Sequence, residues 1–173
     1  PINDPPAEAV GLDGIEKIVR DESLINACKD GQDLDARWNM MMASTEGAMA
    51  FSKGLGAVHS MSHAIGANQE LRLHHGTLNG VILPTVIRFN KDHVGDKLPR
   101  ILRAMGKSES ADLADEIEKF NEKINLPSGL KEMGVTEEMI PELVEHSITD
   151  PSNVTTPRLP SPEEWEQLFL SAM

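Results

Sequence analysis

The chain has 173 residues, of which 39% are hydrophobic and 25% are charged, and its formal net charge at pH 7 is −12. This composition is typical of a globular protein with one sizeable core, and it argues against disorder over most of the length. The strong negative charge argues against nucleic acid as a partner and against anionic membrane surfaces. No apolar run approaches the roughly 18 residues of a membrane span, and the start shows no signal-peptide pattern.

Cysteine usage indicates the compartment. Cys28 is the single cysteine, so no disulfide can form within the chain. A cytoplasmic, reducing environment is therefore expected. Cys28 has no neighbouring histidine and no Cys-x-x-Cys partner, and we expect it to be a core residue.

Helical periodicity begins early. Asp4 can cap a helix with Pro5 at its first position, and apolar residues then recur at helical spacing to about Arg20. A polar stretch follows at residues 21–33, in which Leu24 and Ile25 are expected to be buried. A second strong helix is predicted at residues 34–52.

The later part of the chain continues this pattern. Pro84 interrupts an apolar helical run at residues 81–89, where it is expected to kink the helix or to start a new one. Ser161, Pro162 and Glu164 form a capping-box pattern. Further helices are expected at residues 97–105, 110–124, 137–149 and 161–172. No segment shows the alternation of a strand. The predicted fold class is all-α, a multi-helix, bundle-like domain of about seven or eight helices.

A histidine-rich segment suggests chemistry. His59 and His63 are four residues apart, so on a helix they share one face. His75 comes sixteen residues after His59 and would lie on the far side of a straight helix. The two can meet only if the chain turns between them, and the polar residues 68–70 supply a place for that turn. A second helix is then predicted to open near Gly76, with His75 at its start.

Two histidines on one helix face are a common half of a metal site, because neutral imidazoles bind zinc or iron(II). Taken alone, such a pair more often consists of ordinary surface or core histidines. A third imidazole from His75 favours the functional interpretation, since three rings can then converge. His74 is expected to point elsewhere, and His93 and His146 are interpreted as surface residues.

The glycines before the histidines do not form a dinucleotide motif. A dinucleotide-binding loop that began with Gly54 and Gly56 would need a third glycine at position 59, where this chain has His59. The two glycines also follow a predicted helix, whereas the motif follows a strand. We expect them to permit close backbone packing around the histidine-bearing helix.

The histidine segment resembles the C-terminal helical domain of the iron-containing (group III) alcohol dehydrogenases, in the dehydroquinate synthase-like superfamily. That family carries a motif like G-x-x-H-x-x-x-H-x-x-G-A, followed by H-G-x-x-N-x-x-x-L-P. The matching positions here are Gly56, His59, His63, Gly66, Ala67, His75, Gly76, Asn79, Leu83 and Pro84. The flanks agree at Asp4-Pro5-Pro6-Ala7, Leu12-Asp13 and Thr156-Pro157-Arg158.

The resemblance implies a site and an activity. Residues matching His59 and His75 bind the catalytic metal, Fe(II) or Zn(II), and the residue matching His63 lies by the nicotinamide of NAD or NADP and is a candidate for proton relay. The implied reaction is the reversible oxidation of alcohols to aldehydes or ketones, with the metal as a Lewis acid on the alcohol oxygen. The spacing from His63 to His75 is two residues longer than in one branch of the family, and Ala64 replaces a frequent proline. The particular alcohol, the metal and the nucleotide therefore stay open.

The resemblance also implies that residues 1–173 are a single helical, metal-binding C-terminal domain. The family's nucleotide-binding α/β domain and its other two metal ligands, an aspartate and a histidine, precede such a segment and are absent from this chain. On its own the chain is expected to be inactive and to bind metal weakly. The full-length protein is expected to form a homodimer or a higher homo-oligomer.

Two other interpretations stay open. The nearer one is a relative of the maleylacetate-reductase or glycerol-dehydrogenase type. The more distant one is a non-catalytic helical interaction domain, in which the histidines would diverge. Convergence of the rings of His59 and His75 would support the dehydrogenase interpretation.

Overall fold

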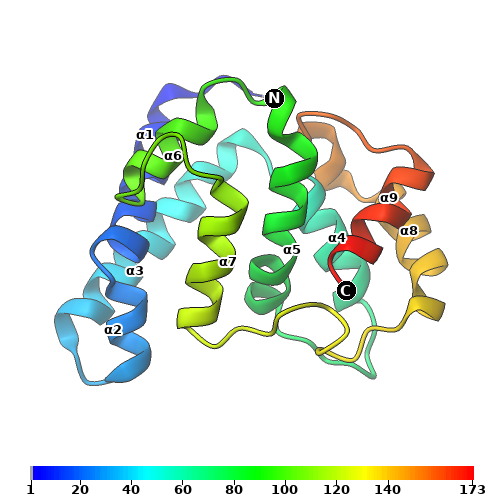
Figure 1. Ribbon diagram of the computed structural model, residues 1–173, viewed down its shortest axis with the longest axis horizontal. Helices are drawn as coiled ribbons and strands as arrows, with labels where there is room; N and C mark the ends of the chain where they lie inside the picture. Colours follow the sequence, from blue (N-terminus) through cyan, green and yellow to red (C-terminus); the bar gives the residue numbers. More distant parts are fainter. Residues whose placement is uncertain (1) are drawn as a thin grey trace.

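The computed structural model describes residues 2–173, and helices are the regular secondary structure of that range (Figure 1). Its nine α-helices are α1 (Pro5–Ile15), α2 (Ser23–Lys29), α3 (Leu34–Met49), α4 (Ala57–Gly66), α5 (His75–Asn90), α6 (Lys97–Ala104), α7 (Leu113–Lys123), α8 (Ile140–Thr149) and α9 (Pro162–Ser171). A π-helical segment, η1 (Glu16–Arg20), extends α1. Short 3-10 segments are η2 (Ala50–Lys53), η3 (Lys91–His93), η4 (Glu137–Met139) and η5 (Pro151–Thr155). The predicted all-α class is confirmed.

Side-chain caps begin the first and last helices where the sequence predicted them. Asp4 accepts a hydrogen bond from the backbone N–H of Ala7 at 3.1 Å, with Pro5 at the first helical position. Ser161 and Glu164 form a reciprocal capping box at the start of α9. These two helix starts are therefore encoded by a few neighbouring residues.

Helix α2 corrects two expectations. It lies in the polar stretch in which no helix was predicted, and it packs against α3. Ile25 is buried there, as expected. Cys28, expected in the core, is instead exposed. The reason is its place in the last turn of α2, directly before residues 29–32, which are exposed as well. The chain turns towards α3 after this helix (Figure 1).

Helix α5 runs without interruption through Pro84, which therefore does not start a new helix. A proline inside a helix has no N–H for the carbonyl four residues earlier. Here that carbonyl belongs to Gly80, and the side-chain amide of Asn121 in α7 donates to it at 2.8 Å. The neighbouring helix thus replaces the hydrogen bond that Pro84 removes.

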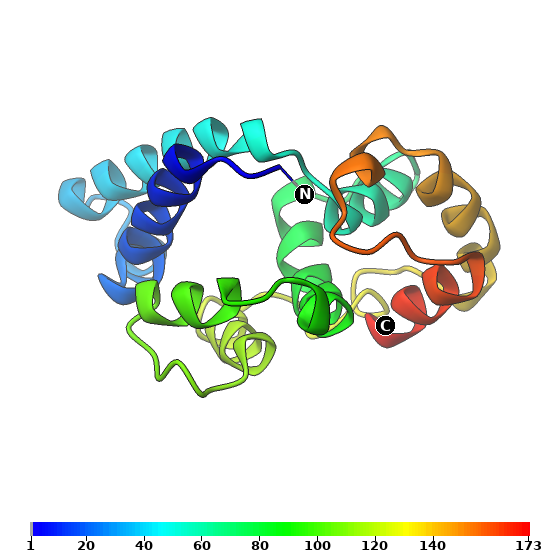
Figure 2. The same ribbon diagram turned by 90° about the horizontal axis from the view of Figure 1, so that it is seen from above.

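Two groups of buried apolar side chains stabilise the fold. The larger joins α4, α5, α8 and α9, and its fully buried members include Met61, Ile65, Leu78, Ile82, Trp165 and Phe169. The smaller joins η1, α6 and α7 around Leu102, Met105 and Leu113. Helix α5 lies between the two groups (Figure 2) and contributes to both, through Ile82 and Ile87 respectively.

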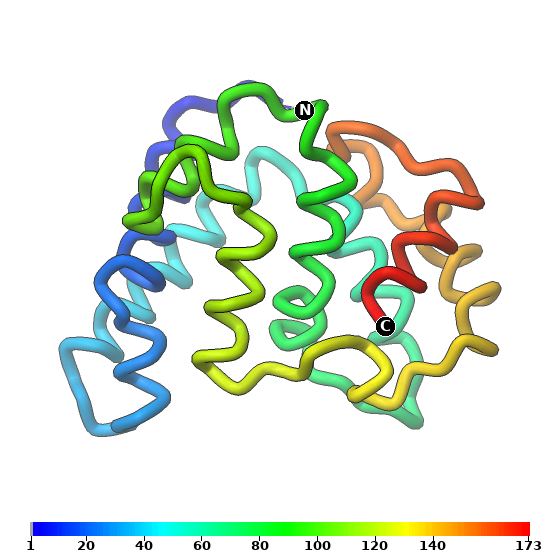
Figure 3. The backbone as a smooth tube through the Cα atoms, in the orientation of Figure 1, coloured from blue at the N-terminus to red at the C-terminus, as the bar shows by residue number. Residues whose placement is uncertain are grey.

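The C-terminus is tied to the loop that precedes α8 (Figure 3). The backbone N–H of Leu130 donates to the carbonyl of Ala172 at 2.8 Å, and that of Lys131 donates to Met173 at 3.3 Å. Leu130 is completely buried there. Among residues 2–173, no helix has both the length and the apolarity needed to cross a membrane.

Candidate metal centre

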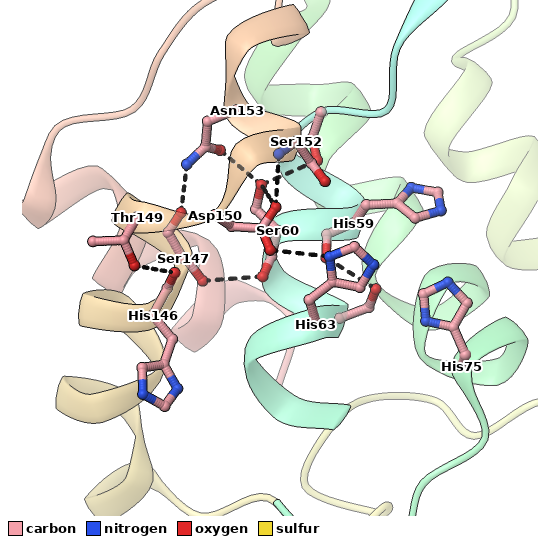
Figure 4. A network of polar contacts seen from close by, with 12 residues as sticks. His59, Ser60, His63, His75, His146, Ser147, Thr149, Asp150, Ser152 and Asn153 are labelled. Atoms are coloured by element: carbon pink, nitrogen blue, oxygen red, sulfur yellow. Dashed lines mark hydrogen bonds and ion pairs between the residues drawn. The ribbon is translucent and has the colours of Figure 1, made fainter. Parts of the chain in front are cut away.

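Helices α4 and α5 bring three histidines together. His59 and His63 lie one turn apart on α4, and His75 is the first residue of α5, as the turn between the helices predicted. Their side chains extend into the same space from the two helices (Figure 4). The ring centroids are 5.3 Å apart for His59 and His75, 5.5 Å for His63 and His75, and 5.7 Å for His59 and His63. The rings therefore converge.

Two glycines set the entry to α4. Gly54 has φ +85°, and a Cβ at this position would overlap the side chain of Thr155 in η5. Gly56 has φ +112°, and its Cβ would lie 3.5 Å from Oγ1 of Thr156. The predicted close packing around the histidine-bearing helix is confirmed, because η5 lies directly against the chain that leads into it.

Asn79 connects His59 and His75. One turn into α5, its side-chain Nδ2 lies 3.0 Å from Nε2 of His75 and 3.4 Å from Nε2 of His59. An amide nitrogen only donates, so both Nε2 atoms present lone pairs to it. The Oδ1 of Asn79 is buried and has no partner in residues 2–173. The two imidazoles therefore present two nitrogen lone pairs to one point.

Burial favours the neutral form of His59. Burial is the main reason why the pKa of His59 lies below its ordinary value, and the proximity of His75 and His63 lowers this pKa further, whereas Asp150 opposes the shift. The ring of Phe51 stands edge-on to His59, with centroids 6.2 Å apart. A neutral imidazole is the form that binds a metal ion.

His63 has a separate partner. Its Nδ1 lies 3.0 Å from Oδ2 of Asp150, the residue at the junction of α8 and η5. Burial by itself raises the pKa of Asp150, but hydrogen bonds from Ser152 and His63 outweigh it, and the pKa lies below its usual value. Asp150 therefore faces His63 as a carboxylate.

The sequence pattern did not identify Asp150 as a site residue. It lies 87 residues from His63 in the chain, at the start of a stretch predicted to be irregular. The only local signal is an aspartate before Pro151, which is typical of an ordinary cap or turn. Asn79 was visible only as one position of the family motif.

The remaining histidines lie outside this site, as predicted. His74 caps α5 by accepting a hydrogen bond from the backbone N–H of Thr77 at 3.3 Å. His93 and His146 are exposed. In the part of the chain that the structure describes, no group of three or more His, Cys, Asp or Glu side chains is placed to hold a metal ion.

The sequence of the chain decides the family. The model of the Fe-containing alcohol dehydrogenase family, C-terminal, matches residues 3–173. The chain belongs to this family. The resemblance carried by the histidine motif is therefore confirmed.

Curated dehydrogenases match nearly the whole chain. A 4-hydroxybutyrate dehydrogenase of Cupriavidus necator is 41% identical over 180 residues, which is 100% of this chain and 47% of that protein. The NAD-dependent methanol dehydrogenase of Bacillus methanolicus is 31% identical over 178 residues, 98% of this chain and 46% of that protein. The chain thus spans about half the length of the curated relatives it matches.

Solved structures show the same fold. A crystal structure of 1,3-propanediol oxidoreductase matches with a TM-score of 0.90 at 30% identity, covering 98% of this chain and 46% of that one. Maleylacetate reductase from Agrobacterium tumefaciens matches with a TM-score of 0.82 at 19% identity, covering 98% of this chain and 46% of that one, and this likeness shows the fold alone.

The donor set of this family member fits a divalent transition metal. Imidazole nitrogens suit iron(II) and zinc, and the lone pairs of His59 and His75 already converge on the Asn79 amide. Two nitrogens are half of the four ligands of a typical zinc site.

Proposed function

We propose that this chain is the metal-binding, C-terminal half of a nicotinamide-dependent alcohol dehydrogenase, acting reversibly on short primary alcohols and their aldehydes. The observation that carries the proposal is the convergence of His59 and His75 on one point, with Nε2 atoms 3.4 and 3.0 Å from the amide nitrogen of Asn79. Diverging rings would have suited a non-catalytic interaction domain.

In the proposed site, His59 and His75 hold the metal. When bound, Fe(II) or Zn(II) supplies a Lewis acid for the alcohol oxygen, and NAD or NADP supplies the hydride acceptor. The low pKa of His59 keeps its imidazole in the neutral form that a metal needs. Metal binding would replace the two contacts that the Asn79 amide makes with these Nε2 atoms.

His63 is the proposed proton carrier. Its side chain is 42% exposed, so it can pass a proton to water, and its ring stacks on that of His75 with an interplanar angle of 17°. A histidine in this position can accept the alcohol proton on a ring nitrogen and release it to solvent.

The other half of the proposed enzyme would supply nucleotide binding and the remaining metal ligands. The relatives are about twice as long as this chain, which supports a further domain. Exposed large apolar side chains support it as well, because α3 and η2 leave Leu34, Trp38, Met41, Met49 and Phe51 uncovered. Phe51 lies at the histidine site itself, so the proposed second domain would close the site from this side.

The test is alcohol oxidation by the full-length enzyme loaded with iron(II) or zinc, assayed with both nicotinamide nucleotides. We would try 4-hydroxybutyrate first, given the 41% identity to an enzyme of that name, followed by methanol and 1,3-propanediol. We expect His59→Ala to lower turnover by about 10²-fold or more. The matched control is His146→Ala, at an exposed histidine on α8, which should leave turnover unchanged. Unchanged alcohol oxidation by His59→Ala would contradict the proposed role of that residue.

A further inference from the structure

The contact between His63 and Asp150 joins an exposed ring to a mostly buried carboxylate. The His63 side chain is 42% exposed, the Asp150 side chain is 14% exposed, and their Nδ1 and Oδ2 atoms lie 3.0 Å apart. The other ring nitrogen of His63, Nε2, points away from Asp150 (Figure 4). One nitrogen is therefore engaged and the other is open to the site.

The Asp150 carboxylate is held in a fixed position. Its Oδ1 accepts a hydrogen bond from the backbone N–H of Ser152 at 2.8 Å, which caps η5. The same segment is joined to α4, because the Ser60 hydroxyl donates to Oδ1 of Asn153 at 2.7 Å. The Asn153 amide in turn donates to the carbonyls of Ser147 and Ile148.

This geometry dictates where the proton of His63 resides. A carboxylate can only accept hydrogen bonds, so Nδ1 of His63 must be the donor. In a neutral imidazole the lone pair then lies on Nε2. We propose that Asp150 is a positioning residue, which fixes the ring orientation and the Nδ1–H tautomer of His63 so that Nε2 is the atom that accepts the alcohol proton.

This inference rests on the proposed function for the identity of the proton donor. The tautomer itself does not depend on that function. A carboxylate that orients a histidine in this way sets its tautomer without itself becoming protonated.

The decisive variant is Asp150→Asn. An asparagine keeps the shape of the side chain and can still cap Ser152 through its oxygen. Its amide nitrogen then faces Nδ1 of His63 and donates a hydrogen bond to it, which favours the Nε2–H tautomer. In that tautomer Nε2 has no lone pair to accept the alcohol proton. We expect nitrogen NMR of histidine-labelled full-length enzyme to show His63 protonated at Nδ1 in the wild type and at Nε2 in Asp150→Asn.

Kinetics of the full-length enzyme provide the second readout. We expect Asp150→Asn to lower kcat by about 10²-fold or more, with KM, the melting temperature and the metal content unchanged. The same substitution in a His63→Ala background should have no further effect, because Asp150 acts through His63. Asp112→Asn, at the aspartate that caps α7, is the control and should preserve both the tautomer and kcat.

Two results would overturn the inference. One is wild-type His63 protonated at Nε2. The other is a loss of kcat caused by Asp150→Asn that is as large in the His63→Ala background as in the wild-type enzyme. If the wild-type enzyme oxidises no alcohol, the proposed function fails, and the NMR comparison still decides whether Asp150 sets the tautomer.

Discussion

At the scale of single residues, Gly54 decides how closely η5 can approach the chain that leads into α4. Its φ of +85° lies in a region that residues with a Cβ rarely adopt, and its missing side chain leaves room for Thr155. Residues just beyond Gly54 and near Thr155 carry the site, namely His59 on α4 and Asp150 before η5. A change here should therefore disturb both the fold and the histidine cluster.

We expect Gly54→Ala to lower the free energy of unfolding by about 1–3 kcal/mol, because the new methyl group meets Thr155 and the backbone is strained. Gly47→Ala is the matched control, since Gly47 lies inside α3 and a Cβ there meets no atom within 4 Å. That change should raise the free energy by about 0.4–1 kcal/mol. Urea unfolding of both variants measures the difference, and equal stability would contradict the close contact.

The candidate site was only partly predictable from individual residues. The period of a helix placed His59 and His63 on one face, and the polar turn allowed His75 to return to them. Asp150 could not be found in this way, because its relation to His63 depends on α8 packing against α4 across 87 residues. Local sequence carries no information about such a contact.

At the scale of helices, the sequence predicted those helix starts that depend on neighbouring residues. The features that it did not predict depend on contacts between helices. The caps at Asp4 and Ser161 were predicted because their partners lie within three residues. For Pro84 the sequence left open whether the helix would continue with a kink or begin anew, since the amide that compensates the proline comes from Asn121 on another helix. Helix α2 was missed for the same reason, because it is short and packs against α3.

Glu8 connects three of these elements. From α1 its carboxylate pairs with Lys53 of η2 at 2.7 Å and with Arg100 of α6 at 2.7 Å, and it also contacts Lys97 of α6. Hydrogen bonds from Lys53, Lys97 and Arg100 lower the pKa of Glu8 to about 2. The folded state therefore favours the ionised carboxylate more strongly than the unfolded chain does.

This shift predicts the pH dependence of Glu8→Gln. Because the folded pKa of Glu8 lies below the unfolded value of 4.5, its stabilising effect is present above pH 4.5 and is lost as the pH falls towards about 2. We expect Glu8→Gln to cost about 1 kcal/mol at pH 7, after allowing for solvent screening of the exposed cations, and nothing near pH 2. Glu145→Gln, at an exposed position on α8, should change stability by less than about 0.5 kcal/mol. A pH-independent effect of Glu8→Gln, measured by urea unfolding, would contradict the ion-pair interpretation.

At the scale of the whole molecule, α5 joins the two buried groups and also carries His75 and Asn79. The position of the candidate site is therefore set by the core of the fold and not by a mobile loop. Family membership was predictable from the motif because the spacing of its histidines and glycines is specific. The homo-oligomer, the cytoplasmic location and the division into two domains stay predictions.

The most direct measurement of the central proposal is the metal content of the full-length enzyme and its histidine variants. We expect one iron or zinc ion per wild-type subunit, and an affinity lower by at least about 10-fold in both His59→Ala and His75→Ala. His63→Ala and His146→Ala should retain the metal, since we assign neither as a ligand. Wild-type metal affinity in both His59→Ala and His75→Ala would contradict the assignment of these two histidines as metal ligands.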